Sequence, residues 1–154
     1  MRRLLPILAV LALSLAAFGA QAQPAVTGSR VQPLGDDSLY QSFGAEAGLN
    51  RLMDEFVKRL KADPRIGSFF ASTDLPNLKA MLAQQLCVLA GGPCTYSGAP
   101  MRAVHADLEI DKSAFNALVE VLQTTMDAQG IPFAAQNRML AQLAPMHRDI
   151  VTKD

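Results

Sequence analysis

The residues with the clearest chemical potential lie between Gly91 and His105, where one of only two histidines follows a loop rich in glycine and proline. Gly91-Gly92-Pro93 ends a helix, and we expect Gly98 to allow a tight turn, because glycine adopts positive φ freely. His105 then follows in a short helical segment among apolar residues. A neutral imidazole on an apolar wall suits an iron ligand, although a structural histidine is the commoner explanation.

The elements that must position this histidine are helices. From residue 38 onward apolar residues recur with helical spacing, and no convincing strand is present. We expect a short helix near 39–43, a short turn from Asp63-Pro64 to Phe69-Phe70, and long helices at 49–61, 75–90, 114–128 and 133–151. Pro145 should bend the last of these. The sequence predicts an all-α domain, and periodicity leaves a two-over-two sandwich and a four-helix bundle open.

The glycine-rich segment resembles the haem-ligand segment of the group 1 truncated haemoglobins, with the pattern Gly-Gly-Pro-x-x-Tyr-x-Gly-x-x-Met-x-x-x-His. The similarity runs from Leu39 to Val151 and includes Glu55-Phe56 and the Phe69-Phe70 pair. Gly44-Ala45 departs slightly from the family's paired glycine. The resemblance implies a truncated globin-like two-over-two helical sandwich around a haem, in a domain spanning residues 38–154.

The same resemblance assigns site residues. His105 takes the place of the proximal ligand to the iron of haem b. The residues that should contact the haem are Phe70, Leu78, Lys79, Leu82, Tyr96, Met101, Arg102, Phe115 and Leu118. Lys79 and Arg102 are the nearest cations for the propionates, or else belong to a solvated face. His147 matches no iron-ligand position and is expected at or near the surface of the last helix.

The ligand side of the haem departs from the family. Members usually carry a tyrosine where this chain has Val57, and often a glutamine in the third helix where it has Leu78 and Leu82. Gln85 reaches in if that helix is rotated, and is otherwise a solvent-side residue. We therefore expect an unusually apolar distal pocket that binds O2 weakly, because bound O2 has no hydrogen-bond donor.

The resemblance implies reversible binding of a diatomic gas (O2, NO or CO) at five-coordinate iron, for oxygen transport or NO handling, with no catalytic residues. One alternative is a haem enzyme that detoxifies NO or reacts with peroxide; it would require an electron donor. Another is a cofactor-free helical interaction module, which composition does not exclude.

Residues 1–22 are typical of a secretory signal peptide, with Arg2 and Arg3 before an apolar run and cleavage after Ala22. A membrane anchor is the alternative, but the run is shorter than the ~20 residues of a spanning helix. A disordered lead over 23–37 should follow. Removing the leader leaves 14 − 2 = 12 basic residues against 14 acidic ones, which argues against nucleic acid or a membrane as partner.

Two cysteines are relevant to the predicted export. In a periplasmic or secreted protein, Cys87 and Cys94 would meet an oxidising compartment. They form a disulfide that pins the loop before His105, or remain as two free thiols; the sequence leaves both readings open.

Overall fold

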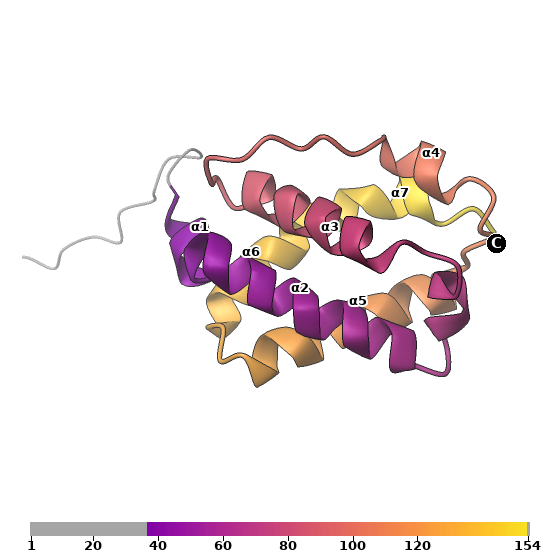
Figure 1. The fold of residues 1–154 in the computed structure, drawn as a ribbon, viewed down its shortest axis with the longest axis horizontal. Helices are drawn as coiled ribbons and strands as arrows, with labels where there is room; N and C mark the ends of the chain where they lie inside the picture. Colours follow the sequence, from indigo (N-terminus) through magenta and orange to yellow (C-terminus); the bar gives the residue numbers. More distant parts are fainter. Residues whose placement is uncertain (1–36, 154) are drawn as a thin grey trace, which may run out of the picture. The chain divides into compact units, whose positions relative to one another are not determined.

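Seven α-helices and two 3-10 turns make up residues 37–153, the part of the chain that the computed structural model describes (Figure 1). The predicted signal peptide and all but the last residue of the predicted lead lie outside the described residues. No strand occurs within residues 37–153, so the all-α expectation is confirmed. The elements are α1 (Ser38–Ser42), α2 (Ala45–Ala62), η1 (Gly67–Phe70), α3 (Leu75–Leu89), α4 (Met101–His105), α5 (Lys112–Ala128), α6 (Phe133–Leu143), η2 (Ala144–Met146) and α7 (His147–Ile150).

Side-chain caps and glycines fix the ends of the helices around the site. The Asp74 carboxylate accepts a hydrogen bond from the Asn77 backbone N–H at 3.2 Å, and Pro76 occupies the first turn of α3. Asp111 caps α5 in the same way, through the Ala114 N–H at 2.7 Å. Beyond α3, Gly91 has a φ of 78°, the left-handed conformation that glycine tolerates best.

Two local expectations need correction. The last predicted helix is not continuous: α6 ends at Leu143, a 3-10 turn carries Pro145, and α7 restarts at His147, because proline lacks the N–H that a continuous helix needs. Gly98 is also not among the glycines with positive φ. A Cβ at this position would instead collide with the end of the Tyr96 side chain, so Tyr96 would have to move.

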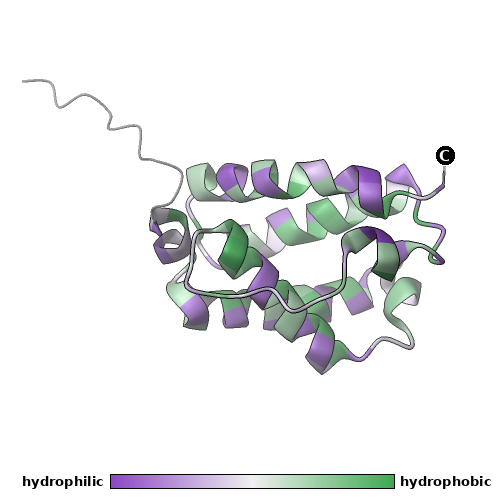
Figure 2. Ribbon diagram, turned by 90° about the horizontal axis from the view of Figure 1, so that it is seen from above, coloured by the Kyte–Doolittle hydropathy of each residue, from purple (hydrophilic) through white to green (hydrophobic). Residues whose placement is uncertain are grey.

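Helix α2 lies at the centre of the packing and contacts both α3 and α5. Its inward face contributes several of the most buried side chains, among them Leu49, Leu52, Met53 and Leu60. Figure 2 shows the corresponding alternation of hydrophobic and hydrophilic residues along the helices. Within residues 37–153, no helix is long and apolar enough to cross a membrane.

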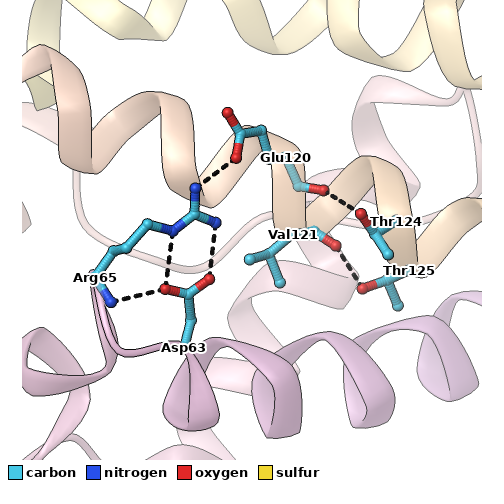
Figure 3. A network of polar contacts seen from close by, with 6 residues as sticks. All are labelled: Asp63, Arg65, Glu120, Val121, Thr124 and Thr125. Carbon is cyan, nitrogen blue, oxygen red and sulfur yellow. Dashed lines mark hydrogen bonds and ion pairs between the residues drawn. The ribbon is translucent and has the colours of Figure 1, made fainter.

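A polar network joins the end of α2 to α5 (Figure 3). Arg65 donates two side-chain hydrogen bonds to Asp63, at 2.8 and 3.1 Å, and a third to Glu120 on α5. The hydrogen bonds from Arg65 hold the pKa of the Asp63 carboxyl below its usual range, and the same contacts raise the pKa of Arg65. This network, which we call the corner clamp, fixes the turn that leads into η1.

Candidate haem site

A cavity of about 690 Å³ opens between α2, α3, α4 and α5. Most of its lining is aliphatic or aromatic, so it favours a large apolar guest. The lining residues are Phe56, Leu60, Ile66, Phe69, Phe70, Thr73, Asp74, Asn77, Leu78, Met81, Leu82, Gln85, Tyr96, Ser97, Gly98, Ala99, Met101, Val104, His105, Leu108, Ile110, Ala114, Phe115, Leu118 and Ile150.

His105 presents a metal-binding nitrogen in the wall of this cavity. Its Nδ1 lies 2.7 Å from the Met101 carbonyl oxygen. A carbonyl only accepts hydrogen bonds, so Nδ1 carries the proton of the neutral ring and Nε2 keeps its lone pair. One imidazole supplies one ligand, which suits a metal whose other positions are filled by a macrocycle.

The shape and chemistry of the lining fit haem. Val104 and Leu108 are 48% and 40% exposed, yet both line the cavity beside His105. When exposed apolar side chains line the same cavity, an apolar ligand that fills the cavity can cover them. Together with Phe70 and Phe115, they supply the apolar crevice that a porphyrin requires.

The loop between α3 and α4 is tied to α3 in two places. A disulfide joins Cys87 on α3 to Cys94 in the loop, with their Cα atoms 5.9 Å apart. Farther along, the Gln84 side-chain oxygen accepts hydrogen bonds from the Ser97 N–H at 3.1 Å and its hydroxyl at 2.9 Å. These ties hold Tyr96 and Ser97 at the cavity. Of the two alternatives for Cys87 and Cys94, the structure therefore has the disulfide.

Most of the site residues named from the sequence come together here. The cavity gathers His105 with Phe70, Leu78, Leu82, Gln85, Tyr96, Met101, Phe115 and Leu118. Three others are placed elsewhere. Val57 is buried but does not line the cavity, Lys79 pairs with Asp54, and Arg102 pairs with Asp149. Their predicted roles toward haem stay predictions.

Gln85 faces inward and is only 9% exposed, so the expectation of a solvent-side residue is wrong. Its amide donates to the sulfur atoms of Met101 at 3.5 Å and Met146 at 3.3 Å. Thioether sulfurs are weak acceptors. Gln85 therefore lies against α4, the helix that carries His105, and its predicted role beside a bound gas stays a prediction.

Several lining residues were missed from the sequence. Met81 could have been found, because it lies three residues after Leu78 and so shares its helix face. Val104 and Leu108 are four residues apart, a spacing that places them on one face of a helical turn. Ile150 offers no such pattern: it lies on α7, and only the contact between α4 and α7 brings it near.

Comparisons with known proteins agree with this geometry. A model of the family described as Bacterial-like globin matches residues 38–152. The group 1 truncated hemoglobin GlbN of Mycolicibacterium paratuberculosis is 30% identical over 115 residues, which cover 75% of this chain and 85% of that relative. The truncated hemoglobin crystal structure from Tetrahymena pyriformis, Fe(III) form, matches with a TM-score of 0.71 and 27% identity, over 75% of this chain and 98% of that one.

The group II truncated hemoglobin structure from Bacillus anthracis also matches, with a TM-score of 0.68 and 25% identity over 79% of this chain and 94% of that one. The two-over-two helical arrangement is therefore confirmed, and the plain four-helix bundle is set aside. Globins bind haem and, through it, diatomic gases. By sequence and by fold, this chain belongs to the bacterial-like globin family, among the group 1 truncated haemoglobins.

Proposed function

We propose that this protein binds a diatomic gas (O2, NO or CO) reversibly at haem b held by His105, for oxygen transport or NO handling. The observation that carries the proposal is the 2.7 Å contact between His105 Nδ1 and the Met101 carbonyl oxygen. Because a carbonyl only accepts, Nδ1 keeps its proton and donates it in a hydrogen bond, and Nε2 has its lone pair free for a metal. Haem held by His105 would supply an iron able to bind such a gas.

The chain's own residues exclude water from this region and fix the disc. Phe70, Leu78 and Leu82 form apolar wall, and Phe115 and Leu118 add to it from α5. On the ligand side we propose an apolar pocket built on Leu78 and Leu82, with Val57 behind it. Such a pocket offers bound O2 no hydrogen bond, so it favours O2 less than a pocket with a donor does.

A haem enzyme that consumes NO or peroxide remains the alternative, with an electron donor as its partner. The two functions differ in turnover: a reversible binder takes up one equivalent of NO and stops, whereas an enzyme supplied with O2 and a reductant consumes NO continuously. We favour the binder because Leu78 and Leu82 are not acid–base groups of the kind that peroxide chemistry uses.

We further propose that the protein works in the periplasm or outside the cell, after cleavage following Ala22. The disulfide between Cys87 and Cys94 supports this location, because disulfides persist in oxidising compartments and are rare in the cytosol.

Absorption spectroscopy tests the proposed function. The purified protein should show a Soret band, ferric and ferrous forms, and a CO complex. Replacing His105→Gly should abolish the native spectrum, and added imidazole should restore it by filling the vacated space. His147→Ala is the control for loss of a histidine: His147 does not line the cavity, although its ring packs edge-on against Phe115 at 4.8 Å, so the haem should still bind and the Soret band should be kept. A His105→Gly protein with an unaltered spectrum would contradict the proposal.

A further inference from the structure

The edge of the cavity that must receive the haem carboxylates carries no positive charge. Apart from Gln85 and His105, the polar side chains of the lining lie at the start of α3 and in the loop beside it: Thr73, Asp74, Asn77, Tyr96 and Ser97. We call this set the polar rim. Two propionates cannot be buried unpaired, so they must lie at the polar rim or in solvent next to it. Among the described lining residues there is no lysine or arginine, and Asp74 is a carboxylate.

Two of the three hydroxyls of the polar rim, those of Tyr96 and Ser97, are already used as donors. The Ser97 hydroxyl donates to Gln84 at 2.9 Å, and the Tyr96 hydroxyl donates to the Ala99 carbonyl at 3.3 Å. Each hydroxyl has one proton to give. These two residues therefore hold the loop in place, and a carboxylate that sought their protons would have to break those bonds.

The two cations that the sequence suggested for the propionates, Lys79 and Arg102, are held by carboxylates of other helices. Lys79 pairs with Asp54 on α2, and Arg102 with Asp149 on α7 at 3.0 Å. For either side chain to reach a propionate, it must leave its present partner. The gain is then the difference between two exposed ion pairs, which is close to zero.

The interior of the fold depends little on the cavity. Of its largest fully buried side chains, only Leu60 and Ile66 line the cavity, whereas Leu49, Met126 and Met139 pack elsewhere. The disulfide and Gln84 fix the cavity's loop from the protein side. Loss of a ligand from the cavity therefore leaves most of the buried core in place.

We propose, resting on the proposed haem site, that this chain holds haem as an exchangeable guest, which it gives up to an apoprotein that binds haem more tightly. The bond from His105 Nε2 to iron and the apolar contacts hold the disc, and no ion pair locks its carboxylates. On transfer that one coordinate bond breaks, the acceptor's ligand replaces it, and the oxidation state of the iron is unchanged.

The test measures transfer of ferric haem to excess apomyoglobin by the change in the Soret band. Asn77→Lys places a cation in the polar rim and should slow transfer about fivefold, the effect of one exposed ion pair. Asp74→Asn should also slow it, because asparagine keeps the cap of α3 while removing the repelling charge. Asn137→Lys is the matched control on α6, which does not line the cavity, and should leave the rate unchanged.

Two further measurements decide the outcome. Lys79→Ala and Arg102→Ala should not accelerate transfer; a fivefold acceleration by either would show a cationic anchor and overturn the proposal. The native rate should fall modestly between about 0.05 M and about 0.5 M salt, because salt screens the repulsion by Asp74, whereas in Asn77→Lys salt also screens the added attraction and the rate should rise instead. A protein that loads haem and whose transfer rate is unmoved by Asn77→Lys and Asp74→Asn overturns this proposal alone. A protein that never loads haem overturns the proposed function as well.

Discussion

At the scale of single residues, one hydrogen bond sets the chemistry of the site. The Met101 carbonyl selects the His105 tautomer that leaves Nε2 free. Because Met101 lies one helical turn before His105, α4 needs only five residues to orient its own ligand. The short length of α4 is thus compatible with a well-defined imidazole.

A donor placed in the apolar wall should change O2 binding strongly. Leu82 lines the cavity from α3, and Leu82→Gln would supply an amide proton to bound O2. A hydrogen bond to a partly charged group contributes roughly 1.5–3 kcal/mol, so the O2 dissociation rate should fall about 10- to 150-fold. Stopped-flow mixing measures that rate, and CO dissociation should change much less.

The control for this change lies on the same helix. Val88 is exposed and does not line the cavity, so Val88→Gln adds the same amide at a distance and should leave the O2 rate unchanged. A native O2 dissociation rate already as slow as that of Leu82→Gln would show that another side chain donates; Gln85 would then be the first to replace.

The sequence predicts the position of a site residue well when the interactions that place it come from neighbouring residues in the chain. His105, Met101 and Tyr96 belong to one contiguous pattern, so their joint placement at the cavity was predictable. The positions of Lys79 and Arg102 were not, because their partners Asp54 and Asp149 lie 25 and 47 residues away in the chain. Ion pairs across such separations depend on packing that no local pattern encodes.

At the scale of elements, helix ends were easier to predict than helix continuity. The predicted helices at 75–90 and 114–128 match α3 and α5 to within two residues at each end. Each of them begins at an aspartate cap, Asp74 or Asp111, that acts within one helical turn. The interruption at Pro145 was predicted only as a bend. A bend would keep the helix continuous, whereas the 3-10 turn separates α6 from α7. Helix α7 then contacts α4, and Ile150 on α7 lines the cavity.

The corner clamp couples two elements and should make stability depend on acid. The folded-state pKa of Asp63 is lowered by Arg65 from an ordinary value of 3.8. Its stabilising contribution is therefore fully present above pH 3.8 and is lost as pH falls through the lowered folded-state value. In Asp63→Asn this dependence should vanish, so the stability of the two proteins should converge in acid.

Urea unfolding at a series of pH values from neutral to acid measures the difference. The control is Asp107→Asn, because the exposed Asp107 carboxylate makes no hydrogen bond or ion pair within residues 37–153. A gap between native protein and Asp63→Asn that stays constant down to the most acid pH would show that the charge of Asp63 does not stabilise the turn into η1.

At the scale of the whole molecule, two separate features bear on where the protein is located: one in the described domain and one in the predicted signal peptide. The domain carries a disulfide between Cys87 and Cys94. The first 22 residues carry a basic start, an apolar run and a small-residue cleavage site. The two features lie in different parts of the sequence, and both favour export. A disulfide formed after export would then connect α3 to the loop that follows it.

The mass of the intact protein from cells that express the full chain tests both features at once. We expect a chain that begins at Gln23, recovered from the periplasmic or extracellular fraction and lighter by two hydrogens than the dithiol form. Reduction followed by alkylation should then add two alkyl groups, one each at Cys87 and Cys94. A chain that retains Met1 and sediments with membranes would instead favour the anchor, and immediate alkylation without reduction would show that the cysteines are free thiols.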